Sequence, residues 1–218
     1  MIKKFVVCAA LIISLLFGCR NKNNIEEKND IPAKQSINDT SSRNSPVNSL
    51  NLDSYMFRDD VQYVDLRNIE MILEEGHISG FEFIPFYSII ASFNEKETLY
   101  QMVSTRDSND KLISAGQVGS FEPQYEESER ILKSLFSKDK YIFFVSQGGS
   151  ESSYVINLLI QLGYNGNLLY NVGGVMNSEG NPSYSSVETN KYFVYGHGDL
   201  EVSIDYDFMN DLTPIINN

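Results

Sequence analysis

The second half of the chain carries a strand, helix and strand pattern that limits the folds open to it. Residues 141–145 are five consecutive apolar residues, as in a strand that is covered on both faces. A helix is predicted over residues 152–162, because apolar residues recur there at helical spacing and Gly163 is well placed as the C-cap. Residues 168–172 are the next predicted strand. Two strands joined by a helix favour parallel pairing, so this segment predicts an α/β domain.

The first half of the chain repeats this alternation more weakly. Residues 61–66 predict a short strand, residues 68–75 a helix, and residues 83–90 a further apolar run. Residues 95–123 favour no single element, whereas residues 124–136 predict an amphipathic helix. We therefore expect a three-layer α/β/α domain, in which a central parallel sheet has helices on both faces.

The C-terminal part of the chain has a different pattern. Residues 192–195 and 200–204 are β-prone and flank Gly-His-Gly-Asp at residues 196–199. This pattern predicts a β-hairpin. Residues 191–218 are accordingly interpreted as a C-terminal β extension.

The N-terminus has the pattern of a secretory signal. A pair of lysines precedes an apolar stretch over residues 5–17, which is shorter than the roughly 20 residues needed to cross a bilayer. Leu-Phe-Gly-Cys at residues 16–19 resembles a bacterial lipobox, whose cysteine receives a lipid and becomes the first residue of the mature chain. We expect residues 1–18 to be a lipoprotein signal peptide and Cys19 to be lipidated. This predicts a membrane-anchored lipoprotein of the cell envelope that faces the periplasm or the exterior.

Composition divides the remainder of the chain. Residues 19–51 are rich in Asn, Ser, Lys and Asp and hold few large apolar side chains, so they predict a flexible tether. Residues 52–190 then form one domain of ordinary size. Both cysteines lie within the first 19 residues, so disulfides cannot hold this domain together.

The charge balance excludes one class of partner. Without the signal peptide the chain has 15 basic and 29 acidic residues. A surface this acidic is repelled by nucleic acid and by anionic lipid headgroups, so we expect no nucleic-acid partner. The membrane is expected as a partner only through the N-terminal lipid.

The turn between the buried strand and the strong helix is the first candidate for a site. In open α/β sheets, ligands bind where strands deliver their C-terminal ends into loops. Small residues in this turn allow backbone N–H groups to converge next to a helix N-terminus, where an anion or an oxyanion can bind. The alternative is an ordinary turn in which Ser150 or Ser152 is the helix N-cap. The candidate residues are Ser146, Gln147, Gly148, Gly149, Ser150, Glu151 and Ser152.

Three motifs together resemble those of a rhodanese-like domain. The first is Val-Asp-Leu-Arg at residues 64–67, which resembles the Asp-x-Arg that ends a strand in that family. The second is Gly-His-Ile-Ser-Gly at residues 76–80, followed by Ile-Pro-Phe at residues 84–86. The third is the strand, loop and helix described above, followed by a Gly-Gly pair at residues 173–174. The resemblance covers about residues 55–178 and implies a rhodanese-like fold for the domain.

The same resemblance implies that sulfur-transfer chemistry is absent. Members of the family that transfer sulfur have a loop that begins with cysteine, often followed by Arg, with a second Arg five residues after the cysteine. This chain has Ser146, Gln147 and Glu151 at those positions. A serine hydroxyl cannot carry sulfane sulfur as a persulfide, and a glutamate repels an anion that an arginine would bind. No confident catalytic residue follows from the resemblance.

The other motif residues have structural interpretations. Asp65 and Arg67 are expected near the active face, where an ion pair or a capping role accounts for them better than a chemical role. His77 is expected to fix its turn by hydrogen bonding. With two histidines and no free thiol in the mature chain, neither a metal site nor a cofactor is predicted.

Taken together, these features predict a lipid-anchored envelope protein whose domain acts as a binding or scaffolding module. The loop at residues 146–152 is then the expected recognition surface, for a protein or a small anion. Two alternatives are enzymatic: a sulfurtransferase that uses a thiol of a docked partner, and a hydrolase with Ser146 as nucleophile. In the second, His197 with Asp199, Asp205 or Asp207 would supply the base, although Phe144 stands where a nucleophile elbow has glycine.

Overall fold

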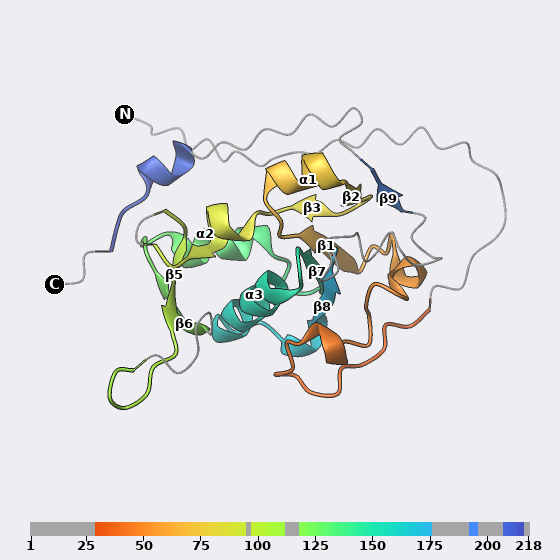
Figure 1. The fold of residues 1–218 in the computed structure, drawn as a ribbon, viewed down its shortest axis with the longest axis horizontal. Helices are drawn as coiled ribbons and strands as arrows, with labels where there is room; N and C mark the ends of the chain where they lie inside the picture. Colours follow the sequence, from red (N-terminus) through yellow and green to blue (C-terminus); the bar gives the residue numbers. More distant parts are fainter. Residues whose placement is uncertain (1–28, 95–96, 112–117, 176–191, 196–206, 216–218) are drawn as a thin grey trace.

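A parallel sheet forms the centre of the molecule. The computed structural model describes residues 29–94, 97–111, 118–175, 192–195 and 207–215. Four strands pair in the order β3-β1-β7-β8, and all neighbours are parallel (Figure 1). They are β1 (Val61–Asp65), β3 (Glu82–Phe83), β7 (Tyr141–Ser146) and β8 (Leu169–Gly174). The predicted α/β class and parallel sheet are confirmed.

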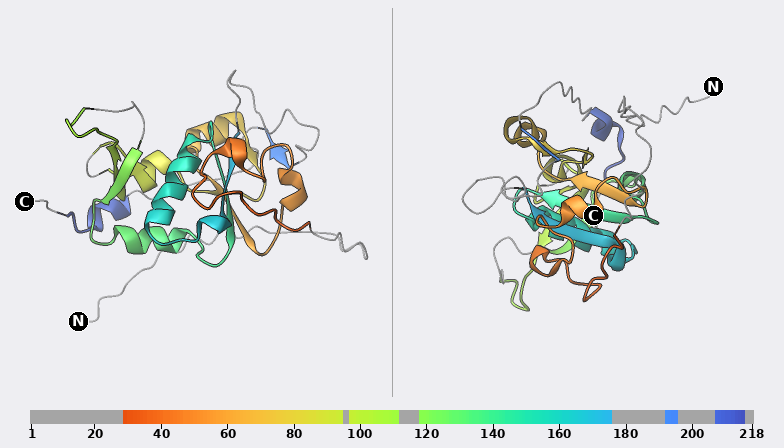
Figure 2. Two further views of the ribbon diagram at one scale, coloured as in Figure 1. Left: turned by 90° about the horizontal axis from the view of Figure 1, so that it is seen from below. Right: turned by 90° about the vertical axis from the view of Figure 1, so that its right-hand side faces the viewer.

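Helices flank this sheet, and the sheet has a separate apolar cluster on each face. Successive residues of a strand point to opposite faces, so Val64 and Phe144 pack in one cluster with residues of α2 (Ser128–Leu135) and α3 (Ser150–Gln161). Tyr63 and Phe143 pack in the other cluster. Figure 2 (left) shows the sheet nearly edge-on between α3 and the segment that precedes β1.

The second face is covered by the chain that leads into β1, which we call the N-terminal strap (residues 29–51). Val47 of the strap is fully buried, as is Leu52 in the 3-10 helix η2 (Leu52–Tyr55). Lys34 Nζ donates to the carbonyls of Gly166 and Leu169 at 3.0 and 2.9 Å. The composition of this segment predicts a flexible tether, but its few apolar residues and one lysine pack on the domain. The packed part of the chain thus begins before residue 52.

A second, smaller sheet is formed mainly by residues 95–123, for which the sequence favoured no single element. It consists of β4 (Ala91–Ser92), β5 (Tyr100–Ser104) and β6 (Val118–Pro123), with β5 and β6 antiparallel. The apolar run predicted over residues 83–90 is strand only at its start. After Pro85 it forms a π-helical turn, η3 (Phe86–Ile90), which buries Phe86 and Ile90.

Helix α2 is shorter than the amphipathic pattern indicates, because it begins at Ser128 and not at residue 124. The backbone before it pairs with the C-terminal segment instead. Ile215 N–H donates to the carbonyl of Gln124 at 2.9 Å, and Glu126 N–H donates to that of Thr213 at 3.0 Å. The carbonyl of Gln124 and the N–H of Glu126 are thus hydrogen-bonded to the C-terminal segment and not within a longer helix.

The remaining elements are short. They are α1 (Ile69–Glu75), which ends at Gly76; the antiparallel pair β2 (His77–Ile78) and β9 (Phe193–Val194); and the 3-10 helices η1 (Ser42–Asn44), η4 (Gly166–Leu168) and η5 (Asp207–Asp211). Within the β-prone run 192–195, Phe193 and Val194 therefore pair with β2. Residues 200–204, the second half of the predicted hairpin, lie outside the described residues.

Within the described part of the chain, no helix is long and apolar enough to span a membrane. The predicted signal peptide and Cys19 lie outside this part.

Candidate functional site

The strands of the parallel sheet end at one edge, and the sequence motifs meet there. Asp65 ends β1 and Ser146 ends β7. Backbone hydrogen bonds continue past the strands: Leu66 N–H donates to Val145 O, and Val175 N–H donates to Ser146 O, each at 2.9 Å. Ligand sites of open α/β sheets form at this edge.

Ser146 is fully buried, and its hydroxyl belongs to the turn. Its Oγ accepts a hydrogen bond from Gly149 N–H at 2.9 Å. Among the described residues, no histidine or carboxylate is hydrogen-bonded to this Oγ, so the geometry supplies no general base for a serine nucleophile. His197, the base considered for that role, lies outside the described residues.

Asn171 on β8 holds the loop in place, and the sequence analysis did not single it out. Its Nδ2 donates to the carbonyls of Gly149 and Thr40 at 2.9 and 2.8 Å, and its Oδ1 accepts from Gly173 N–H at 3.1 Å. The sequence does contain a sign of this role, because Asn171 is the one amide in an otherwise apolar predicted strand. A buried polar side chain needs hydrogen-bond partners.

The N-terminal strap covers one side of the loop. Thr40 Oγ1 lies 2.7 Å from Ser153 Oγ in the first turns of α3. A Cβ placed on Gly149 would lie 3.3 Å from Ser42 Oγ and 3.4 Å from Gly173 Cα. Gly149 has a left-handed backbone with φ of 88° and is the N-cap of α3, so neither Ser150 nor Ser152 has the N-cap role considered for it.

Asp65 and Arg67 form a buried ion pair. This is one of the two structural roles, an ion pair or a cap, that the sequence favoured over a chemical role. Both side chains are inaccessible to solvent, and Arg67 Nη2 lies 2.7 Å from Asp65 Oδ2. The same guanidinium reaches Glu75 Oε2 at 3.3 Å and donates to the carbonyl of Gly76 at 2.8 Å. The arginine thus links the end of β1 to the end of α1, and its charge is already matched by two carboxylates.

Three side chains of the loop have buried oxygen atoms without hydrogen-bond partners among the described residues. Gln147 Nε2 reaches Glu75 Oε1 at 3.4 Å, while Gln147 Oε1 is buried without a hydrogen-bond partner in the described structure. Glu151 Oε2 and Ser152 Oγ are likewise buried and unpartnered within that part of the chain. Gly148 and Ser150 are exposed, and a Cβ on Gly148 would meet no atom within 4 Å.

The negative charge of Glu151 acts on Tyr87 in the neighbouring turn η3. Burial raises the pKa of Tyr87, with smaller contributions in the same direction from the nearby Glu151 and Tyr154, to about 12. A thiosulfate or phosphate ion would meet the same repulsion from Glu151.

His77 is nearly buried, and burial lowers its pKa. Asp65 opposes this shift and Arg67 adds to it. Its ring meets that of Phe83 edge-on at 5.6 Å, and its Nδ1 has no hydrogen-bond partner among the described residues. Its turn is instead held by backbone pairing of β2 with β9 and by Ser79 N–H, which donates to Tyr192 O at 2.8 Å.

Among the described residues, no group of three or more His, Cys, Asp or Glu side chains is arranged to hold a metal ion. Comparison with protein-family models, with curated proteins and with solved structures gives no match to this chain.

Proposed function

We propose that this chain is a lipid-anchored envelope protein whose rhodanese-like domain binds a protein partner and does not transfer sulfur. Three features of the fold support the family resemblance. Asp65 and Arg67 lie at the end of a central strand, the Gly-His-Ile-Ser-Gly motif follows α1 directly, and Ser146 begins a loop between a buried strand and a helix.

The observation that carries the proposal is the state of Ser146. A sulfur carrier needs an accessible thiolate, and a hydrolase needs a hydroxyl that is aligned with a base. Here the residue is a buried serine whose oxygen accepts a backbone hydrogen bond within its own turn. Both kinds of covalent chemistry are thereby disfavoured.

The charges at the loop favour a protein over a small anion. Arg67 is paired with Asp65 and Glu75, and Glu151 occupies the position where the family has an anion-binding arginine. The half-buried side chains of Gln147 and Glu151 flank the exposed positions Gly148 and Ser150, so an amide and a carboxylate border the open part of the loop. A partner that brings N–H donors to the exposed positions Gly148 and Ser150 complements this surface.

The absence of sulfur transfer by the chain itself is tested with a form that begins at Arg20, because this form keeps every described residue of the N-terminal strap. We expect no thiosulfate:cyanide sulfurtransferase activity from it, and none from Ser146→Ala. The double substitution Ser146→Cys and Glu151→Arg restores a thiolate and a cation at the family's positions, so measurable activity is expected only there. Sulfurtransferase activity of the unsubstituted chain would refute the proposal, whether or not it survives Ser146→Ala.

The binding role is tested by site-specific crosslinking in the native envelope. A photoreactive residue replaces Gly148, where the structure has open space, and a control carries it at the exposed Lys111. We expect a discrete crosslinked protein at position 148 that is lost when Glu151 is changed to Lys. Equal crosslinking from both positions would argue against a recognition surface at the loop. Mass spectrometry of the mature chain tests the anchor separately, by the mass of a lipid on Cys19.

A further inference from the structure

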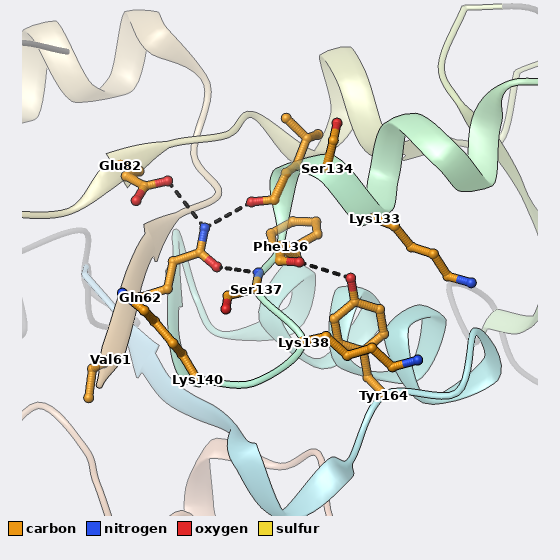
Figure 3. Close-up of a pocket in the computed structure, with 11 residues that line it drawn as sticks. Val61, Gln62, Glu82, Lys133, Ser134, Phe136, Ser137, Lys138, Lys140 and Tyr164 are labelled. Carbon is orange, nitrogen blue, oxygen red and sulfur yellow. Dashed lines mark hydrogen bonds between the residues drawn. The ribbon is translucent and has the colours of Figure 1, made fainter. Parts of the chain in front are cut away.

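A pocket of about 600 Å³ lies at the opposite, amino edge of the parallel sheet (Figure 3). Gln62 at the start of β1, Glu82 at the start of β3 and Lys140 just before β7 all line it. Lys133 and Lys138 come from the end of α2 and the turn after it. Three lysines and one glutamate thus surround this pocket, on a chain whose overall charge is −12.

The polar groups in the floor of the pocket satisfy one another. Gln62 Nε2 donates to the carbonyl of Leu135 at 2.8 Å, and Tyr164 OH donates to that of Phe136 at 2.9 Å. Gln62 Oε1 accepts from Ser137 N–H at 2.8 Å (Figure 3). These bonds occupy carbonyl oxygens at the C-terminal end of α2, whose partial negative charge would otherwise repel an anion.

The lysines are the groups left to bind a ligand. Lys133 is paired with Glu129, whereas Lys138 and Lys140 form no ion pair among the described residues. The carboxylate of Glu82 opposes an anion, but it accepts a hydrogen bond from Gln62 Nε2 at 3.2 Å. Figure 3 shows Lys133 and Lys138 extending on one side of the pocket and Lys140 on the other. An ammonium on a flexible stem can turn toward a ligand that arrives between them.

The path of the chain favours a ligand in the membrane. Arg58, three residues before β1, donates from Nη1 to the carbonyl of Asn29 at 2.7 Å, so the described chain begins at this same amino edge. Nine residues separate Asn29 from Cys19, and nine extended residues span at most about 30 Å. A lipid on Cys19 would therefore keep the pocket within reach of the headgroups.

We propose that this pocket binds the phosphate of an anionic phospholipid headgroup and so seats the amino edge of the domain on the membrane. The inference rests on the proposed lipid anchor. The net negative charge of the chain predicts repulsion from anionic headgroups, but the lysines at this pocket give it a local positive charge that can bind them. In this orientation the loop at residues 146–152, at the other edge of the sheet, faces away from the bilayer toward a partner.

The test uses the lipid-free chain from Arg20, so that no anchor contributes to binding. Co-sedimentation is measured with phosphatidylcholine vesicles and with vesicles that also contain phosphatidylglycerol. A lysine near an anionic surface contributes about five-fold to binding, so Lys138→Gln with Lys140→Gln is expected to weaken binding about 25-fold. The matched control is Arg106→Gln with Lys111→Gln, which removes the same charge from the polar turn between β5 and β6 and is expected to bind as the unsubstituted chain does.

The other outcomes overturn the proposal. Equal binding to both kinds of vesicle, or equal loss in the two double variants, would show that the pocket does not recognise a headgroup. Binding of inorganic phosphate, read from the amide resonances of residues 137–141, without any binding to anionic vesicles would assign the pocket to a soluble phosphate. Absence of a lipid on Cys19 would instead refute the anchor of the proposed function, whereas preferential binding to the anionic vesicles would still support the pocket.

Discussion

At the scale of single residues, two neighbouring glycines in the loop face different demands. Gly149 has φ of 88°, and its Cα is close to Ser42 and Gly173. Gly148 does not have a positive φ and faces open space. Only the first position requires glycine, because a side chain in the left-handed region is strained and this one would also press on the strap.

Gly149→Ala is expected to lower the free energy of unfolding by about 1–2 kcal/mol. Gly148→Ala should leave it unchanged or raise it by up to about 1 kcal/mol, because alanine reduces the freedom of the unfolded chain. Urea unfolding of the two variants of the chain from Arg20 measures the difference. Equal effects would contradict the described loop conformation.

His77 makes stability depend on pH. Its folded-state pKa lies below the ordinary value of 6.5 because burial disfavours the charged ring. Below about pH 6.5 the unfolded chain therefore takes up a proton that the folded chain does not, and the free energy of unfolding falls as pH decreases. Above that pH the residue has no such effect.

His77→Gln is therefore expected to flatten the decline in stability between pH 7 and pH 5. Urea unfolding at a series of pH values measures it, with Asn167→Ala as a control that keeps the histidine. An unchanged pH dependence in the glutamine variant would show that the ring is protonated as readily in the folded chain as in the unfolded one.

At the scale of elements, the N-terminal strap is held by close backbone contact with η4. A Cβ on Gly166 would lie 2.5 Å from the carbonyl oxygen of Ile37 and 2.8 Å from its Cγ1. The strap is also fastened beside this point, where Lys34 Nζ donates to Gly166 O. A methyl group at residue 166 therefore has to displace the strap.

Gly166→Ala is expected to cost about 1–3 kcal/mol of stability, as overpacking does, and to free the strap locally. Because Lys34 loses its two carbonyl partners when the strap moves, trypsin should cleave after Lys34 faster than in the unsubstituted chain. Asn167→Ala, at an exposed neighbouring position, serves as the control and should change neither property. Resistance of the alanine variant at Lys34 would mean that the contact with Ile37 is not made.

At the scale of the whole molecule, the two faces of the sheet are covered by different kinds of chain. Helices α2 and α3 contribute to the cluster on one face, and the strap and η2 contribute to the cluster on the other. Burial raises the pKa of Tyr170 on the second face to about 12, and its hydroxyl donates to Pro32 O at 2.9 Å. Without the strap this face would be open to water.

A chain that begins at Leu52 is accordingly expected to be less stable than one that begins at Arg20. Loss of the buried Val47 alone removes about 1.5–3 kcal/mol of apolar burial, and loss of the tyrosine hydrogen bond adds to this. Urea unfolding and the fluorescence of an apolar dye report the loss of stability and the exposed face. Coincident unfolding curves would show that the strap contributes nothing to the domain.

The local features of this protein are encoded by residues that lie close together in the chain. The buried run before Ser146 is a strand, and the resulting α/β sheet is parallel. The next helix ends at Gln161 with Leu162 as its C-cap, and Gly163, with φ of 82°, follows directly and not as the C-cap itself. These follow from periodicity and capping, which are set by residues close together in the chain. The sequence also shows without a structure that residue 146 is a serine and has no thiol.

The contacts between these elements depend on how distant segments pack. Pairing with residues 213–215 shortened the start of α2, and Asn171 and the strap, distant along the chain, hold the candidate loop. Arg67 pairs with Glu75 because the last turn of α1 lies beside the end of β1, an arrangement that local spacing does not specify. Contacts between distant segments depend on the packing of the whole chain, and neither composition nor local spacing encodes them directly.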